Sequence, residues 1–338
     1  MPEPARARIA AVAAHVPTRY RTMDEIREKI AKSGAYAPPP GLLEDLTGVR
    51  GVHVRGEGQD ASDLAVAAAR QALDEAGLRI DEIDLLLFAA TASDLIEPAT
   101  SHLVAAKMGA TCPVFDVKNA CNSVLNAMET AASFIETGRY RTVLIVCGEV
   151  GSLVTRWNVP DRQALLRALP GYTASDAGAA MVLTAGPADG PGITAMRFVS
   201  NSAAWEACTV SGGGTMHQRS VHDDHTTLRL NGDLRQSLLD VLPGVLAVAG
   251  EELAAARAGS FVAFHQIAMP QYRQMLDAFS LPESVCMPAV AEHGNCAAAS
   301  LPLQLVKARE ADRVEAGDTV AMIGLASGFS FGLALVRW

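Results

Sequence analysis

Phe115-Asp116-Val117-Lys118-Asn119-Ala120-Cys121-Asn122-Ser123 is the stretch that decides the fold. A short extended segment runs into a turn that contains a cysteine, and the helical pattern Val124 to Gly138 and the apolar strand Val143 to Cys147 follow. The first amides of a helix lack intrahelical partners and carry partial positive charge, so we expect them to favour the thiolate form of Cys121. The stretch therefore predicts a nucleophile at a strand-to-helix turn. The alternative, which holds for most single cysteines, is a small buried core residue.

Composition predicts a globular protein that works on small molecules. The chain has 338 residues, of which 49% are hydrophobic, so it can bury a large core as one domain or two related ones. Its formal net charge is −9 and its basic residues are scattered, so we expect neither nucleic acid nor a membrane as partner. The first apolar patch is broken by His15 and Pro17, too early for a secretory signal. The six cysteines form no CxxC pair, which predicts a reducing cytoplasmic location and no structural metal.

Apolar runs of strand length alternate with helical patterns along the first half. Strands are expected at 8–16, 83–90, 114–117 and 143–147, and helices at 23–33, 64–76, 100–108 and 124–138. Ser62-Asp63 should cap the helix 64–76, and the weak pattern at 154–170 predicts a loop or cap. This alternation predicts an α/β fold with a mostly parallel sheet covered by helices.

The second half repeats the same plan. Helices are expected at 238–258 and 272–279, and strands at 261–267 and 319–325. A turn, helix and strand from His293 to Leu325 match the spacing of the segment Asn119 to Val146. The Pro and Gly residues of 186–192 then separate two halves, 1–185 and 186–338. This duplication would place Cys121 and Asn295 at equivalent helix starts.

Three polar residues occupy positions where a core would favour apolar ones. Cys121 opens a helix of the first half, His265 ends a strand, and Asn295 opens a helix of the second half. A thiol, an imidazole and an amide can supply a nucleophile, proton handling and a hydrogen-bond donor to an oxyanion. Taken singly, His265 would be a structural histidine and Asn295 a helix cap. The glycine-rich end Gly324 to Gly332 adds a backbone amide that can complete an oxyanion hole with that of Cys121.

These segments together resemble β-ketoacyl-acyl-carrier-protein synthase III. The resemblance rests on the following motifs, in order over nearly the whole chain: Asn119-Ala120-Cys121, Ser175-Asp176-Ala177-Gly178-Ala179, Phe264-His265-Gln266, His293-Gly294-Asn295 with Ala297-Ala298-Ala299-Ser300, and Gly328-Phe329-Ser330-Phe331-Gly332. It implies the thiolase fold, two duplicated halves in five αβαβα layers, and a homodimer. It also implies that Cys121 takes an acyl group, that His265 and Asn295 bind the second thioester carbonyl, and that the amides of Cys121 and Gly328 form the oxyanion hole. The resemblance further implies acyl thioesters of coenzyme A or a carrier protein as substrates, and no permanently bound cofactor.

The chain departs from the pattern of synthases that start fatty acids. Ala268 and Pro270 stand where those enzymes often have Asn and a basic residue, and no Trp lies near Gly48-Val49-Arg50, where such enzymes often stack adenine. The mode of thioester docking therefore stays open.

Glu97 is a further departure, because a Phe commonly precedes the proline in starter synthases. A glutamate there resembles the head-to-head acyl condensing enzymes of olefin and β-lactone biosynthesis, where it crosses the dimer interface and acts as a base. In an apolar acyl tunnel its pKa would rise, which suits removal of an α-proton. The equally weighted alternative is a surface carboxylate that caps or pairs.

The sequence thus predicts an acyltransferase that performs a Claisen-type condensation in fatty-acid-derived or polyketide biosynthesis. The alternatives are acyl transfer from Cys121 to an alcohol or amine, a papain-like cysteine hydrolase, and a non-catalytic subunit that lends Glu97 to an active one. The cluster His217, His222, Asp223, Asp224 and His225 superficially resembles a metal site, but its Gly-rich context favours a solvated loop.

Overall fold

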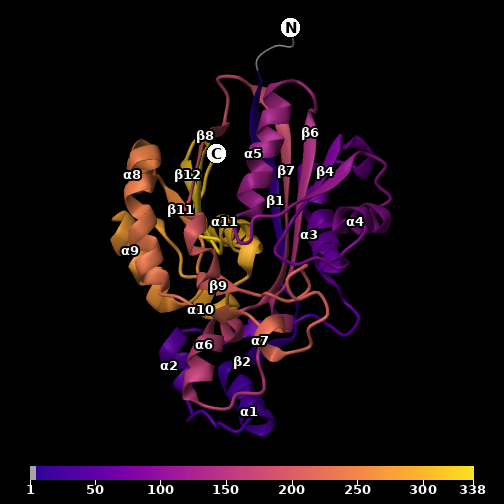
Figure 1. Cartoon of the computed structure of the whole chain (residues 1–338). Helices are drawn as coiled ribbons and strands as arrows, with labels where there is room; N and C mark the ends of the chain where they lie inside the picture. The colour runs from indigo at the N-terminus through magenta and orange to yellow at the C-terminus, as the bar shows by residue number, and fades with distance from the viewer. Residues whose placement is uncertain (1–4) are drawn as a thin grey trace.

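Two β-sheets and the helices around them form the main body of the protein (Figure 1). The computed structural model describes residues 5–338. The first sheet has five strands in the order β1-β7-β6-β4-β5. Its strands are β1 (Ala5–His15), β4 (Leu85–Ala89), β5 (Val114–Val117), β6 (Thr142–Val150) and β7 (Asp176–Pro187). β5 lies at the edge, parallel to β4, which is parallel to β6. β7 is antiparallel to both of its neighbours.

The second sheet has the same topology as part of the first. Its four strands have the order β11-β12-β13-β8 and are β8 (Gly192–Ser200), β11 (Phe261–Phe264), β12 (Thr319–Ala326) and β13 (Ser330–Arg337). β11 and β12 are parallel, and β13 is antiparallel to both β12 and β8, as β7 is to β6 and β1. A single parallel bridge between Val262 and Cys286 occupies the position of the β4–β5 pair. The predicted duplication is therefore visible strand by strand.

Helices complete a five-layer αβαβα arrangement, as predicted. Outside the first sheet lie α3 (Ala61–Ala76) and α4 (Thr100–Met108), and outside the second lie α8 (Leu234–Ala258) and α9 (Met269–Phe279). Between the sheets lie α5 (Ser123–Glu136) and α11 (Ser300–Glu310). Figure 1 shows these layers from α8 and α9 on the left, through α11 and α5, to α3 and α4 on the right. The helix layer between the sheets therefore begins at the two segments that carry Cys121 and Asn295.

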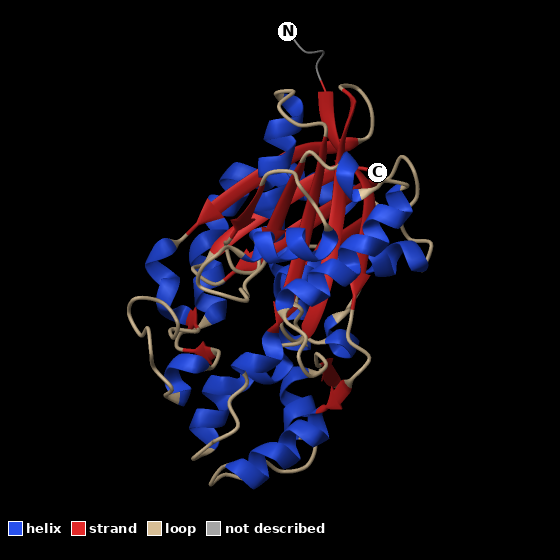
Figure 2. Cartoon of the chain, turned by 90° about the vertical axis from the view of Figure 1, so that its right-hand side faces the viewer, coloured by secondary structure: helices blue, strands red, loops and turns tan. Residues whose placement is uncertain are grey.

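A smaller lobe lies at one end of the two sheets (Figure 2). Its helices are α1 (Met23–Ser33), α2 (Leu42–Thr47), α6 (Arg162–Thr173), α7 (Asp223–Thr226) and α10 (Val290–His293). Its short strands are β2 (Tyr20–Thr22) with β3 (Gly51–His53), and β9 (Cys208–Thr209) with β10 (Arg229–Leu230). The short 3-10 turns of the protein as a whole are η1 (Ile80–Glu82), η2 (Gly151–Val154), η3 (Ser202–Ala207), η4 (Glu283–Val285) and η5 (Ala297–Ala299). Tyr172 and Val49 belong to its own apolar core, so the lobe is packed rather than a set of loose loops.

Several predicted boundaries hold and others differ, since the strand expected at 261–267 ends at Phe264 and the helix expected at 238–258 begins at Leu234. The expectation of a mostly parallel sheet is wrong, because β7 and β13 are antiparallel to both of their neighbours. α1, α4 and β5 begin and end where the sequence pattern places them. The loop or cap expected at 154–170 contains α6, which Asp161 caps through a hydrogen bond to the amide of Ala164. Asp60 rather than Ser62 is the N-cap residue of α3, and of the predicted pair Asp63 takes part, because its carboxylate accepts from the amide of Asp60 (2.9 Å). The division into halves at 185 and 186 stays a prediction, and β7 continues past it to Pro187.

Close approach of α3 to the first sheet depends on glycine. A Cβ atom at Gly178 would lie 2.0 Å from the carbonyl oxygen of Leu64, and one at Gly148 would lie 1.9 Å from that of Ala61. Both oxygens belong to the helix backbone, so no side-chain rotation can relieve the clash. These two glycines therefore set the distance between α3 and the strands β6 and β7.

We predict that Gly178→Ala lowers the free energy of unfolding by about 3 kcal/mol, because α3 must shift away from the sheet. Urea denaturation measures this change. The matched control is Gly250→Ala in α8, where a Cβ meets nothing within 4 Å and the better helix propensity of Ala should leave stability equal or higher. Equal stability of the two variants would contradict the prediction.

Candidate active site

Cys121 lies in a strained turn between β5 and α5. Ala120, directly before it, has φ 47°, a conformation that residues with a Cβ rarely adopt. The Ser123 hydroxyl holds the turn closed, since it accepts a hydrogen bond from the amide of Asn119 (2.9 Å) and donates to the carbonyl of Ala120 (2.7 Å). The turn therefore presents the thiol next to the first amides of α5, as the sequence predicts.

A buried asparagine ties this turn to the C-terminal glycine-rich segment. The Asn122 Nδ2 group donates to the carbonyl and the hydroxyl oxygens of Ser330, both at 3.0 Å. A Cβ at Gly324 would meet Asn122 Oδ1 at 1.9 Å, so only glycine fits opposite this side chain. Gly328, with φ 79°, lies two residues before Ser330. The link holds the Cys121 turn beside the segment whose Gly328 amide is predicted to share the oxyanion hole.

Asn295 is fixed by its backbone and by one end of its side chain. Its amide donates to the carbonyl of Thr173 (2.7 Å), and its carbonyl accepts from the amide of Ser175 (2.9 Å). Its side-chain Oδ1 accepts from the amide of Ala297 (2.9 Å), a residue with φ 46°. The Nδ2 donor group is then the part of the side chain that remains to bind a ligand.

His265 directly follows β11 and is buried. Its amide donates to the carbonyl of Ile323 (2.8 Å), and its Nδ1 has no hydrogen-bond partner within residues 5–338. Burial lowers the pKa of His265 to about 4, so the imidazole is neutral near pH 7. The next side chain, Gln266, hydrogen-bonds Gln304 of α11 (3.0 Å) and the amide of Val290 (3.0 Å), which fixes the chain after the histidine.

The elements that carry the three predicted residues pack on one another between the sheets. α5 contacts both β13 and η5, and α11 contacts both β11 and η5. Glu149, near the end of β6, accepts a hydrogen bond from the amide of Ala298 in η5 (3.3 Å). The helix that follows Cys121 contacts η5, the turn that follows Asn295, so the two segments lie against each other between the sheets. The catalytic roles of Cys121, His265 and Asn295 stay predictions.

The resting state of Cys121 differs from the expected thiolate. Burial, followed by the charge of the Glu149 carboxylate, raises the pKa of this thiol well above its usual range. The thiol is therefore neutral before substrate binds, and its proton must leave during acylation.

Glu97 lies in an exposed loop that joins β4 to α4. The preceding Leu95 and Ile96 are 48% and 82% exposed. The amides that begin α4, Thr100 and Ser101, donate to the carboxylate of Asp116 on the edge strand β5 at 3.0 and 2.8 Å. Glu97 is thus held at the free edge of the first sheet, outside the buried site of its own chain.

Comparison with known proteins matches this architecture to one family. Residues 115–202 match 3-oxoacyl-[acyl-carrier-protein] synthase III, and residues 257–338 match its C-terminal domain. A β-ketoacyl-[acyl-carrier-protein] synthase III of Rhodospirillum centenum is 30% identical over 99% of this chain and 100% of the relative. The chain belongs to the synthase III family. The predicted family, thiolase fold and acyltransferase activity are confirmed, and the protein is a condensing enzyme for acyl thioesters.

Two further relatives come from Xanthomonas campestris. An acyl-CoA:acyl-CoA alkyltransferase is 32% identical over 88% of this chain and 89% of the relative. A crystal structure of an OleA variant with bound lauric acid and lauroyl-CoA has a TM-score of 0.83 and 26% identity, and covers 98% of this chain and 99% of that chain.

Three features of the site in this protein could not be predicted from its sequence. Asn122 and Glu149 are buried polar residues next to the nucleophile, and the only signal for Glu149 was a carboxylate at the end of an apolar strand. The third is Trp157, which packs in the same apolar cluster as Val49 although it is distant in sequence. The Nζ atom of Lys29 lies 3.8 Å from the centre of its ring, and the guanidinium carbon of Arg21 lies 5.3 Å from it. Trp157 and two cations therefore lie together in the smaller lobe, whose apolar core includes Val49.

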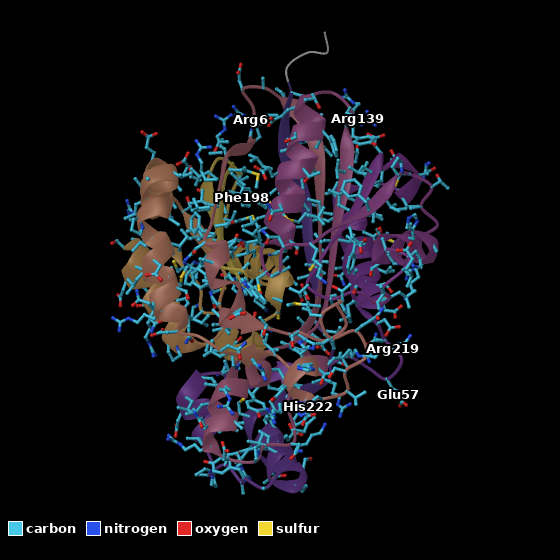
Figure 3. The ribbon with its side chains drawn as sticks, in the orientation of Figure 1. Arg6, Glu57, Arg139, Phe198, Arg219 and His222 are labelled. Atoms are coloured by element: carbon cyan, nitrogen blue, oxygen red, sulfur yellow. The ribbon has the colours of Figure 1, made fainter. Side chains whose placement is uncertain are left out.

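The histidine-rich segment forms no metal centre among the residues that the structure describes. His217 and His225 stack with ring centres 3.8 Å apart, and Asp224 forms ion pairs with Arg156 (2.7 Å) and Arg229 (3.2 Å). Figure 3 shows His222 at the surface of the smaller lobe, where its side chain is exposed. The carboxylate and rings thus serve local packing.

No helix within residues 5–338 has the length and apolar character needed to cross a membrane.

We predict that iodoacetamide alkylates Cys121 slowly at pH 7 and about tenfold faster per pH unit up to pH 9, because only the rare thiolate reacts. Mass spectrometry of the Cys121 peptide measures the rate, and Cys121→Ser identifies alkylation of other cysteines. A rate that is already at its plateau at pH 7 would show a thiolate instead.

Proposed function

We propose that this enzyme joins two acyl thioesters head to head, with Cys121 as nucleophile and Glu97 of the partner subunit as base. The observation that carries the proposal is the placement of Glu97 on an exposed loop fixed to the free edge of the first sheet. The acyl-CoA:acyl-CoA alkyltransferase relative, whose name states two acyl-CoA molecules, supports the same reaction class.

A homodimer through the β5 edge would make Glu97 part of a neighbouring site. β5 pairs on one side only, and its residue Phe115 is 39% exposed. Leu95 and Ile96 extend this apolar surface along the Glu97 loop. An unpaired edge with exposed apolar residues favours pairing with a second copy of the strand. A two-fold axis at this edge would carry each Glu97 into the partner, because a symmetric interface exchanges identical parts.

Acylation of Cys121 would be the first half-reaction. The thiol attacks the carbonyl carbon of the first thioester, the bond from that carbon to the donor sulfur breaks, and the thiol proton leaves with the donor thiol. The amides of Cys121 and Gly328 would stabilise the tetrahedral oxyanion. The neutral His265 imidazole can pass the proton, because it offers one donor and one acceptor nitrogen near pH 7.

Carbon–carbon bond formation would be the second half-reaction. Glu97 of the partner subunit takes an α-proton from the second acyl thioester, while His265 and Asn295 Nδ2 donate hydrogen bonds to its carbonyl oxygen. The resulting enolate attacks the acyl carbonyl on Cys121, and the carbon–sulfur bond to the enzyme breaks. Cys121 recovers a proton, and the product is a 2-alkyl-3-ketoacyl thioester. No carboxylate is lost, so no malonyl donor is needed.

The cluster Lys29, Arg21 and Trp157 supports a phosphate-bearing thioester as donor. Burial and the neighbouring cation Arg19 lower the pKa of both Arg21 and Lys29, which indicates like charges held together. Two cations over an indole ring can bind phosphate groups and a stacked base. Coenzyme A carries both groups, and the phosphopantetheine arm of a carrier protein carries a phosphate.

The direct test is a mixed dimer of Cys121→Ala and Glu97→Ala chains, separated by two affinity tags and incubated with one acyl-CoA. One site of this dimer has an intact Cys121 and the partner's intact Glu97, so we expect about half of the wild-type condensation rate. Each variant homodimer should be inactive, while Glu97→Ala should still show the acyl adduct on Cys121 by mass spectrometry.

An inactive mixed dimer would show that Glu97 does not act across an interface. Product that appears only with malonyl-CoA would assign the enzyme to decarboxylative condensation, and product that requires an alcohol or amine would assign it to acyl transfer. Either outcome would overturn the head-to-head proposal and leave the synthase III membership unchanged.

A further inference from the structure

Glu149 is a buried carboxylate next to the reaction centre that neither half-reaction uses. It lies near the end of β6 and is 1% exposed. Its Oε1 accepts from the amides of Thr91 (2.8 Å) and Ala298 (3.3 Å), and its Oε2 accepts from the Thr91 hydroxyl and the amide of Ala92 (3.4 Å). Four strong donors from two separate segments thus converge on one side chain, and the Cys147 thiol adds a weak one.

The arrangement of donors matches an ionised carboxylate. Three backbone amides can only donate, so a protonated Glu149 would lose an acceptor position. Burial raises the pKa of Glu149 to about 7, and the hydrogen bonds from Thr91, Ala298 and Ala92 oppose that rise. An apolar core residue of the same volume would leave these amides unsatisfied, which explains why a carboxylate is present at a cost in desolvation.

One side of this network leads to Asn295. The amide of Ala298 belongs to η5, and the amide of Ala297 in the same turn binds Asn295 Oδ1 (2.9 Å). Ala297 holds φ 46°, a conformation that the surroundings must enforce. Glu149 anchors the residue directly after this strained position, so it fixes which way the Asn295 Nδ2 donor points.

The other side leads to the Glu97 loop. Thr91 and Ala92 directly follow β4 and begin the loop that ends at α4. Two of their amides and one hydroxyl bind the Glu149 carboxylate. The Glu149 carboxylate therefore holds both the start of the Glu97 loop and the Asn295 turn.

We infer that Glu149 is a positioning residue that holds the Asn295 turn and the Glu97 loop in register for carbon–carbon bond formation. The inference rests on the proposed function for the role of the Glu97 loop, whereas the Asn295 connection applies to condensation with any second thioester. Glu149 acts through these two segments and touches no substrate.

The charge of Glu149 has a second effect, which works against acylation. Together with burial, its carboxylate raises the pKa of the Cys121 thiol. It has the same effect on the pKa of the Cys147 and Cys296 thiols. Removal of the charge should therefore make Cys121 more reactive, while loss of the hydrogen bonds should make condensation slower. A residue that only stabilised the fold would change both properties in the same direction.

The test is Glu149→Gln, which keeps the size of the side chain and removes its charge. We expect alkylation of Cys121 by iodoacetamide at pH 8 to be severalfold faster than in wild type. The rate of condensation with the second thioester that wild type accepts should fall about tenfold or more. Loss of one charge-assisted hydrogen bond has an effect of this size. Single-turnover acylation of Cys121, measured by mass spectrometry, should not fall.

Cys147→Ala is the matched control, because Cys147 lies on the same strand and its thiol is only a weak donor to Glu149 Oε1, at 3.9 Å. It should keep condensation near the wild-type rate. Thr91→Val removes one donor to the carboxylate and should lower turnover less than Glu149→Gln. Equal losses in acylation and condensation, or slower alkylation, in Glu149→Gln would overturn the inference. If the wild-type enzyme required a malonyl donor, the proposed head-to-head reaction would be disproved. The role of Glu149 would still be testable, because wild type and Glu149→Gln can be compared with that donor.

Discussion

Two helices that begin inside the protein determine the chemistry of this enzyme. α5 and α11 lie between the two sheets, and each is preceded by a strained residue, Ala120 or Ala297, beside a polar side chain. Such turns persist only where the surroundings enforce them. The Ser123 hydroxyl closes the Cys121 turn by donating to the carbonyl of Ala120. Asn122 donates to Ser330, and the Glu149 carboxylate accepts from the amide of Ala298, so these two contacts join the turns to other segments. The buried helix starts thus bring a thiol and an amide donor to one region.

Burial sets the protonation states there as strongly as neighbouring charges do. It keeps the Cys121 thiol protonated and the His265 imidazole neutral, so the resting site carries no thiolate–imidazolium pair. The nearby buried carboxylate is Glu149, whose charge is balanced by backbone amides rather than by a cation. Bound substrate must therefore trigger the proton movement, which suits an enzyme whose nucleophile should stay unreactive until a thioester arrives.

Much of this organisation could be predicted from the sequence, because periodicity and short motifs report local structure. The turn at Cys121, the duplicated halves and the strand that ends at His265 all follow from patterns within a few dozen residues. The thiolate was expected because helix amides are local, whereas the desolvation that reverses it comes from residues far along the chain. Trp157 against Lys29 and Glu149 against Ala298 are likewise contacts of large sequence separation, which no local pattern reveals.

In the proposed reaction Cys121 carries the first acyl group, while His265 and Asn295 bind the carbonyl of the second thioester at the start of the two central helices. A crystal structure of the enzyme acylated on Cys121 by a slowly turned-over acyl thioester tests it most directly. We expect the acyl carbonyl oxygen within hydrogen-bond distance of the amides of Cys121 and Gly328, with the His265 ring and Asn295 Nδ2 facing the space beside the thioester carbon. An acyl group on another residue, or on Cys121 with His265 and Asn295 turned away from it, would disprove these roles.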